Sequence, residues 1–517
     1  MNRKHIKTPL FYLLLAMVCL SACTKSTHLT VIPHNATFVG KANMVKIGLK
    51  IPRRKAFINE VLGEVMGNES KDNFGEMKNT GINFLTPYIF GGKTALNKGY
   101  FAIALPLNNA KKLEEFILKM DKTARIQVEK TVKYMELGNG NILGWNTKNL
   151  LFLTSVKLKD NRNLKEELFR LHNLSGRKML LSANKNFKVF QKTKSDMGLW
   201  LNMAELNKTK TIQLITSKAD LTDNYSHVFT NYKKGKIEME VNYFAGDSTQ
   251  QSYNNLFKSA ITSKLVNSIP LDNPLLLAAT SFSMEGIKQL LKDKKLYARV
   301  DKSVRSLGTN FQELTNMLNG ELVFGLSDIR LVEREKKIID EYTKEVFIEK
   351  ETRPVADFVI AAGVENEAVY KRLMKTFLQS GMVQKDGGHY TFYKELFMIE
   401  KNKVLYFTNN ARLRTGILND QHMQNSGILQ FMQGKSGAIQ TNAHFASKLG
   451  QSATFMKILR DLKFPAINNI RMYFTNEDKK TIQGKCVINF KNKSENALVV
   501  LFNAFKKDLL KSARKGK

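Results

Sequence analysis

Apolar and polar residues alternate along the chain in short runs, which are separated by longer stretches with helical spacing. Polar breaks at Gly138-Asn139-Gly140 and Lys401-Asn402 indicate hairpins between neighbouring runs. No strict strand–helix alternation is visible, so the pattern favours an α+β fold with antiparallel sheets over a doubly wound parallel sheet. Strands are predicted near 132–137, 141–145, 150–155, 390–393, 396–400 and 404–408, and helices at 45–66, 284–300 and 498–509, the last with Ser494 as its cap.

The pattern of apolar and polar residues occurs twice along the chain. Five blocks recur in the same order at offsets between 238 and 257, and this order is hard to obtain by chance. In both copies a further strand ends in an asparagine, Asn202 or Asn442, which is a suitable helix cap. We therefore expect an internal duplication with two homologous halves, 31–262 and 263–517, each with an antiparallel sheet and packed helices. The matched blocks are 35–44 with 273–282, 100–117 with 357–374, 151–155 with 405–409, 229–231 with 474–476, and 237–244 with 481–490.

One segment breaks the repeat. Residues 328–353 have no counterpart of that length in the first half, and they carry seven Lys/Arg against eight Asp/Glu. We interpret this charged insertion as a solvated extension of a hairpin or a charged helix. An element that docks a partner is the alternative.

The N-terminus has the features of a secretory signal. Arg3, Lys4 and Lys7 precede an apolar run at 11–20, which is too short to cross a bilayer that needs about twenty residues. Leu20-Ser21-Ala22-Cys23 then fits the lipobox of bacterial lipoproteins. By that resemblance, signal peptidase recognises Leu20, Ser21 and Ala22, residues 1–22 are removed, and Cys23 carries the lipid. Residues 23–30 would form a tether. The alternative is an ordinary cleaved signal with a chance cysteine.

Acyl chains on Cys23 would anchor the chain to a membrane without a transmembrane helix. Acidic residues directly after such a cysteine often mark export to the cell surface. Cys23 is followed by Thr-Lys-Ser-Thr-His, which contains no acidic residue. We therefore expect an outer-membrane lipoprotein on the periplasmic face rather than the cell surface. Cys19 lies inside the signal, and Cys486 sits in an alternating run that predicts a small buried strand residue rather than a nucleophile.

The short motifs that resemble catalytic or metal-binding sites are incomplete in this chain. Gly434-Lys435-Ser436 resembles the end of a phosphate loop, but Leu429 stands where the loop needs glycine. The eight histidines show no zincin spacing, and His444 is interpreted as a structural residue near a helix start. No Gly-x-Ser-x-Gly elbow occurs, and acidic pairs such as Glu114-Glu115 are expected on the solvated faces of amphipathic helices. We predict no catalytic residue, no metal ligand and no cofactor. The chain has only two tryptophans, Trp145 and Trp200, and this small number weakens the case for a site that stacks sugar rings.

The chain of 517 residues has 81 Lys/Arg against 46 Asp/Glu, a formal net charge of +35. Loss of residues 1–22 leaves 78 against 46, or +32. Such a surplus attracts anionic envelope polymers such as lipopolysaccharide or acidic glycans. The alternative is a lysine-rich composition that reflects the lineage and serves no specific anionic ligand. The charge is spread over both halves and no nucleic-acid module accompanies it, so no nucleic-acid partner is expected.

Several short motifs point to one family. They are Val31-Ile32-Pro33-His34-Asn35-Ala36-Thr37-Phe38-Val39, Gly81-Ile82-Asn83 before a Pro-Tyr-Ile-Phe strand at 87–90, and Asn319-Gly320-Glu321 before an apolar strand. With the lipobox, they resemble a family of Bacteroidetes lipoproteins of unknown function (DUF four-eight-three-six). The resemblance implies location and architecture and supplies no catalytic residue. We expect a lipid-anchored, non-enzymatic binding or scaffolding module of the cell envelope. An envelope hydrolase acting on glycan or lipid, and a polyanion-binding protein, are the alternatives.

Overall fold

The computed structural model divides into two compact units. Unit 1 comprises residues 1–246 and 494–517, and unit 2 comprises residues 247–493. The structure describes residues 27–51, 79–94, 99–138, 140–155, 162–208, 221–257, 260–293, 295–305, 308–339, 346–392, 396–445, 448, 467–478, 481–501 and 503.

Unit 1 is built on one antiparallel sheet. Its described strands lie in the spatial order β4-β5-β6-β7-β3-β2-β1-β8-β9-β10. The strands are β1 (Phe38–Ala42), β2 (Tyr88–Lys93), β3 (Gly99–Pro106), β4 (Gln127–Glu129), β5 (Val132–Gly138), β6 (Asn141–Trp145), β7 (Asn149–Ser155), β8 (Met197–Asn202), β9 (Tyr225–Lys233) and β10 (Lys236–Phe244). The helices are η1 (Thr27–Val31), α2 (Met44–Lys50), α5 (Ala110–Met120), α6 (Arg162–His172), η3 (Gly176–Lys178), α7 (Leu180–Ala183), α8 (Lys185–Lys192) and α9 (Met203–Asn207).

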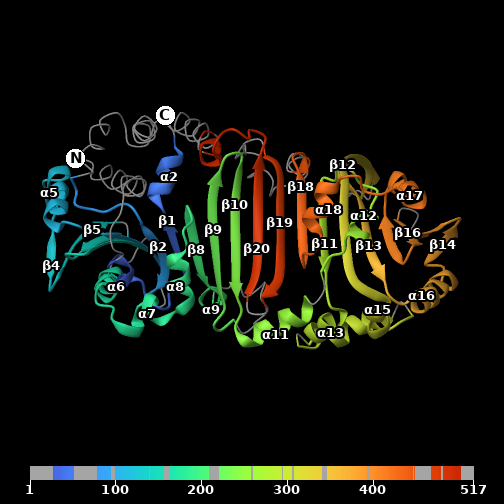
Figure 1. The fold of residues 1–517 in the computed structure, drawn as a ribbon, viewed down its shortest axis with the longest axis horizontal. Coiled ribbons are helices and arrows are strands. Elements are labelled where there is room, and N and C mark those ends of the chain that lie inside the picture. The colour runs from blue at the N-terminus through green and yellow to red at the C-terminus, as the bar shows by residue number, and fades with distance from the viewer. Residues whose placement is uncertain are drawn as a thin grey trace. The chain divides into compact units, whose positions relative to one another are not determined.

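The core of unit 1 has two parts. Helices α6, α7 and α8 lie together against the sheet (Figure 1), and Leu168 and Phe187 pack there with Trp200 in the main cluster. A second cluster joins Phe116 of α5 to Phe152 of β7. These apolar side chains recur at helical spacing in the helices and alternate in the strands, which is why both periods were visible in the sequence.

Unit 2 has the same strand order, β14-β15-β16-β17-β13-β12-β11-β18-β19-β20, also antiparallel throughout its described residues. Its strands are β11 (Leu276–Ser281), β12 (Leu318–Ile339), β13 (Val346–Val364), β14 (Val383–Asp386), β15 (His389–Phe392), β16 (Leu396–Lys401), β17 (Val404–Thr408), β18 (Gly437–Asn442), β19 (Ile467–Asp478) and β20 (Thr481–Phe490). Its helices are α11 (Asp247–Leu256), α12 (Ser263–Asn267), α13 (Met284–Asp293), α14 (Tyr297–Arg305), α15 (Phe311–Met317), α16 (Glu367–Gln379), α17 (Ala411–Leu418) and α18 (Ser426–Met432).

Unit 2 also has two main apolar clusters. Leu265 of α12, Ile417 of α17 and Ile428 of α18 pack on one face of the sheet with Val359. Tyr370 and Leu373 of α16 pack in the other cluster. Together with unit 1, this arrangement confirms the predicted α+β class with antiparallel strands.

Several local predictions can be compared directly. The predicted hairpin strands correspond to β5 to β7 and β15 to β17. Strands β4 and β14 were missed because they are short and mostly exposed, so their residues show little alternation. The single helix expected over 284–300 is wrong: it is two helices, α13 and α14, and Lys295 between them has a left-handed φ of 56°. In the described residues, no helix is long and apolar enough to span a bilayer.

Candidate functional site

The main difference between the two sheets is one hairpin. Strands β12 and β13 occupy the places that β2 and β3 hold in unit 1, but they are 22 and 19 residues long against 6 and 8. Among the described residues, β12 pairs with β11 only as far as Leu326, and β13 pairs with β17 only from Val359 onward. Beyond these points the strands pair with each other. We call residues 328–339 and 346–357 the ribbon; it contains the described part of the segment expected as a charged insertion.

A bulge marks the start of the ribbon. The register runs from Leu326 opposite Phe358 to Asp328 opposite Asp357, so Ser327 is the extra residue on β12. Side chains alternate along a strand, and one extra residue moves all later side chains to the opposite face. Ile329 therefore continues the face of Leu326, and the two pack in the same apolar cluster.

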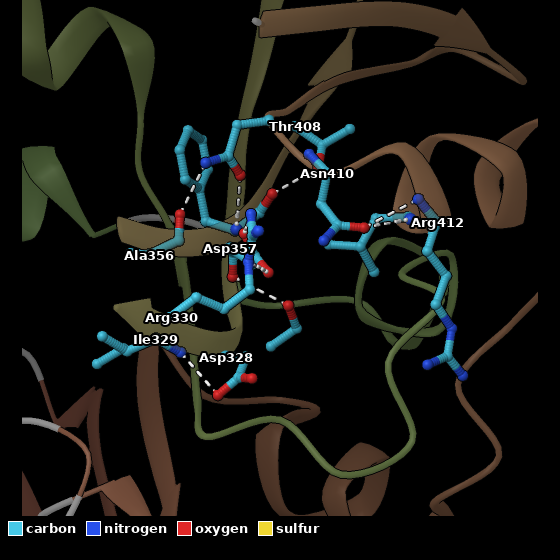
Figure 2. A network of polar contacts seen from close by, with 12 residues as sticks. Asp328, Ile329, Arg330, Ala356, Asp357, Thr408, Asn410 and Arg412 are labelled. Atoms are coloured by element: carbon cyan, nitrogen blue, oxygen red, sulfur yellow. Dashed lines mark hydrogen bonds and ion pairs between the residues drawn. The ribbon is translucent and has the colours of Figure 1, made fainter. Parts of the chain in front are cut away.

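An ion pair lies directly beside the bulge. Arg330 donates from Nε to Asp357 Oδ2 and from Nη2 to Asp357 Oδ1, both at 2.7 Å. The Asp357 side chain is 5% exposed whereas that of Arg330 is 52% exposed. Ser327 Oγ also donates to the backbone oxygen of Asp357 at 3.0 Å. Figure 2 shows the guanidinium and the carboxylate facing each other across the two strands. The pair joins the strands where the ribbon leaves the sheet.

At the base of the ribbon, side chains at the end of β17 form hydrogen bonds with the backbone of β13. Thr408 Oγ1 donates to the Phe358 oxygen at 2.6 Å, and Asn409 accepts from Phe358 N at 3.0 Å and donates to the Ala356 oxygen at 2.7 Å. These side chains replace the backbone partners that β13 loses where β17 stops. Asn410 then caps α17 by accepting from Arg412 N and Leu413 N (Figure 2). Three consecutive polar residues thus end a strand, bind its neighbour and begin a helix.

A second carboxylate at the junction is more exposed. Asp328 Oδ1 accepts from its neighbour Ile329 N at 2.8 Å and lies 2.9 Å from Lys448 Nζ. The hydrogen bond from Lys448 holds the pKa of Asp328 below its usual value, against the effect of partial burial.

The other buried carboxylates are paired in the same manner. Glu167, on α6, binds Arg170 through both oxygens. Asp196 accepts from Tyr232 N at 2.6 Å and from Lys50. Glu238 contacts two lysines of its own hairpin, Lys233 and Lys236. Burial opposes ionisation of Glu238, but the two lysines outweigh it and lower its pKa to about 2. Such pairing is what a buried charge requires for stability.

Unit 1 contains a partly buried lysine, Lys41, beside a buried histidine, His227. Lys41 Nζ donates to the backbone oxygens of Gln191 and Thr193 at 3.1 and 2.8 Å, where α8 ends. Burial lowers the pKa of Lys41 to about 8. His227 is 1% exposed, and neither of its ring nitrogens has a hydrogen-bond partner among the described residues. Burial, and then the charge of Lys41, lower the pKa of His227 to about 4. The imidazole is therefore neutral at physiological pH.

A second histidine of unit 1 behaves similarly. His172 at the end of α6 is within 3.3 Å of Asn146 through Nδ1, and burial lowers its pKa to about 4. In unit 2, burial and the nearby Arg414 lower the pKa of His389. The three rings come from different elements: His172 lies on α6, His227 on β9 and His389 on β15. In the described residues, no group of three or more metal-ligating side chains converges.

The residues singled out by sequence can now be placed. Leu20, Ser21, Ala22 and Cys23 lie outside the described residues. Cys486 lies on β20 and is half-buried, and burial raises the pKa of its thiol. Asn202 caps α9 by accepting from Glu205 N, and Asn442 accepts from His444 N, so both polar contacts were predicted correctly.

Three further expectations concern chemistry. Trp145 and Trp200 are both fully buried, so neither offers a face to a sugar. Lys435, from the segment that resembles the end of a phosphate loop, lies just before β18. Its Nζ is 4.7 Å from the centre of the Tyr473 ring. Glu114, expected on a solvated helix face, instead contacts Lys133 at 2.8 Å and accepts from Trp145 Nε1 at 3.3 Å. That expectation was wrong because Lys133 and Trp145 come from the neighbouring strands β5 and β6.

Sequence reasoning missed the junction at the base of the ribbon. Arg330 and Asp357 were both inside or beside the charged insertion, but a charged run does not reveal which members pair. The repeated block that contains Thr408 and Asn409 was the available signal, since polar residues directly after a buried strand often bind the neighbouring backbone.

No curated protein matches the chain. Crystal forms III, I and IV of TP0453 show a distant structural likeness, with TM-scores of 0.27, 0.27 and 0.25 and identities of 13%, 12% and 11%. The matched part covers 44%, 45% and 43% of this chain and 86%, 86% and 81% of those chains. The model of a domain of unknown function, DUF4836, matches residues 40–498. This match spans most of the chain, which therefore belongs to the DUF4836 family.

Proposed function

We propose that this protein is a lipid-anchored, non-enzymatic module of the cell envelope that binds a protein partner through the ribbon. The observation that carries the proposal is the exposure of large apolar side chains near the ribbon's end, where Val346, Phe347 and Ile348 are 57%, 51% and 59% exposed. Contiguous exposed apolar residues mark interaction sites more often than isolated ones do. A hydrolase has less support, because Glu167, Asp196, Glu238 and Asp357 are each engaged in an ion pair.

The proposal includes duplication of one α+β unit. The identical strand order supports it, and so do hydrogen bonds at matching positions. Leu107 N donates to the Lys148 oxygen at 2.8 Å, and Val364 N donates to the Lys403 oxygen at 2.8 Å. Asn83 accepts from Leu85 N in unit 1 as Asn319 accepts from Glu321 N in unit 2. A ribbon in only one of two such units is the expected result of specialisation after duplication.

The anchor is tested by metabolic labelling with a fatty acid. We expect the wild-type chain to incorporate label and to partition with membranes, and Cys23→Ala to do neither. Cys486→Ala is the matched control, since Cys486 lies on β20 of unit 2 and should leave labelling unchanged. Equal labelling of the Cys23→Ala variant would end this part of the proposal.

Binding through the ribbon is tested by site-specific photocrosslinking in cells. A crosslinker at Phe347 should give discrete protein adducts, whereas one at Val128, an exposed apolar residue of unit 1 (64% exposed), should not. Absence of adducts from Phe347, or identical adducts from both positions, would contradict a binding role for the ribbon.

A further inference from the structure

Strands β18, β19 and β20, which are neighbours in unit 2 (Figure 1), carry polar side chains on one face. Cross-strand partners share a face of a sheet, as do residues two positions apart along a strand. Gln440 is opposite Arg471 in the β18–β19 ladder, and Tyr473 is opposite Lys485 in the β19–β20 ladder. These four side chains therefore point to the same face, which we call the polar face. Helix α18 borders it, because Phe431 of α18 packs against Tyr473 with ring centres 6.0 Å apart.

Two polar atoms on the polar face are buried without a hydrogen-bond partner among the described residues. They are Gln440 Oε1 and Arg471 Nε. Gln440 is 9% exposed, so its side chain is largely shielded from water. Buried polar groups in folded proteins are normally paired, because an unpaired one is costly. One of these atoms accepts and the other donates, so a bound molecule that offers both a donor and an acceptor would satisfy both.

Three basic side chains lie on or beside the polar face. Lys435 Nζ is 4.7 Å from the centre of the Tyr473 ring, and the Arg471 guanidinium is 5.4 Å from that of Phe431. Lys485 is half-buried opposite Tyr473. In the part of the chain that the structure describes, none of the three forms an ion pair with a carboxylate. Aromatic rings attract cations without neutralising them, so the polar face keeps a local surplus of positive charge.

The corresponding place in unit 1 can be identified from the strand pairing. β1 pairs with β8 through Val39 and Trp200, and β11 pairs with β18 through Leu277 and Gln440. Val39 and Leu277 occupy the same position in the matched sequence blocks near the start of each half. Trp200 is therefore the counterpart of Gln440.

Unit 1 fills this place with closely packed rings. His227 is opposite Trp200 on β9, as Arg471 is opposite Gln440 on β19. Trp200 and His227 are 0% and 1% exposed, and the ring centre of Trp200 is 5.6 Å from that of Phe187. Unit 2 thus has an amide and a guanidinium where unit 1 has a closed aromatic core. Such a replacement costs packing energy, which a bound ligand would offset.

We infer that the polar face is a binding site for an anionic saccharide, a sugar that carries a carboxylate or a phosphate group. The site lies on β18, β19 and β20, whereas the ribbon belongs to β12 and β13. It is therefore a second site of unit 2 and goes beyond the proposed function.

Each part of the ligand has a partner on the polar face. The acid group accepts from Arg471, and Lys435 and Lys485 supply further positive charge. A hydroxyl group beside it donates to Gln440 Oε1. The next row of the face adds the amide of Asn469, a further partner for hydroxyl groups. An inorganic anion lacks the hydroxyl groups and a neutral sugar lacks the charge, so neither matches the whole face.

The test is titration calorimetry of the purified full-length chain with glucuronic acid and with a glucose phosphate at physiological salt. Glucose and inorganic sulfate are the controls, because each offers only one part of the ligand chemistry. We expect at least one charged sugar to bind at least about tenfold more tightly than either control, the size of one hydrogen bond to a charged group. The tighter of the two charged sugars identifies the acid group as a carboxylate or a phosphate. Absence of binding by both, or equal binding of glucose or sulfate, would overturn the inference.

Variants locate the binding on the polar face. Arg471→Leu and Gln440→Leu should each weaken binding of the charged sugar at least about tenfold. Lys485→Gln, at a half-buried position, tests the same face if a substitution at Arg471 disturbs folding. The matched control is Arg412→Leu, which removes the same charge from an exposed position on α17 and should bind like wild type. Equal affinity of Lys485→Gln, Arg471→Leu and the control would overturn the inference. Adducts from the ribbon in cells would then leave the proposed binding role standing.

Discussion

The guanidinium of Arg330 forms two hydrogen bonds of 2.7 Å with the carboxylate of Asp357, at the point where β12 and β13 leave the sheet. Asp357 is buried, so removal of Arg330 leaves an uncompensated charge there. We expect Arg330→Ala to lower the midpoint of thermal unfolding and to increase hydrogen exchange in the ribbon.

The matched control for Arg330→Ala is Arg353→Ala. Arg353 also lies on the ribbon and contacts Glu351, but Glu351 is 41% exposed. Exposed pairs contribute little, so this variant should unfold like the wild type. Equal effects of the two substitutions would show that the buried carboxylate does not depend on Arg330.

Buried neutral histidines make the stability of unit 1 depend on pH. His172 and His227 have pKa values near 4 in the folded chain, against an ordinary value of 6.5. The unfolded chain therefore binds more protons between these values, so stability is full above pH 6.5 and falls as pH drops towards 4. Each pKa unit corresponds to about 1.4 kcal/mol.

We expect His227→Phe to reduce this loss, as measured by urea unfolding at a series of pH values. His422→Phe is the control, because His422 is exposed in unit 2. An unchanged pH profile for His227→Phe would mean that the buried imidazole is not the group that titrates.

Matching helix caps allow a test of the resemblance between the units. Asn109 accepts from Lys112 N at the start of α5, and Asn366 accepts from Val369 N at the start of α16. Each substitution by alanine should lower the free energy of unfolding of its own unit by about 1 kcal/mol. Asn→Asp at either position keeps the acceptor and favours the helix N-terminus, so it should preserve stability. A loss of stability at only one position would indicate that the starts of α5 and α16 are not equivalent.

The net charge of +35 predicts an electrostatic attraction to anionic surfaces. The unlipidated chain should bind vesicles that contain anionic lipid, and this binding should weaken as salt rises, because salt screens exposed charges. Neutral vesicles are the control. Anionic-vesicle binding that does not change with salt would exclude a polyanion-binding role based on the lysine surface.

Local features were predictable from the sequence. The strands β5 to β7, the helix cap at Asn202, the local hydrogen bond to Asn442 and the α+β class all depend on residues a few positions apart. Predictions failed where distant residues intervene. The helix expected over 284–300 is interrupted near Lys295, and Glu114 binds Trp145, 31 positions away, instead of facing solvent.

The sequence by itself determined the α+β class, the hairpin strands β5 to β7 and β15 to β17, and the charge, because periodicity acts over a few residues. Only the tertiary structure decided which charged groups are paired. Asp357 is 27 positions from Arg330, and Asp196 is 36 positions from Tyr232. Such contacts form only when separate strands align in register, and the register here includes the bulge at Ser327. The same alignment decides that Phe347 is exposed while Trp145 and Trp200 are buried.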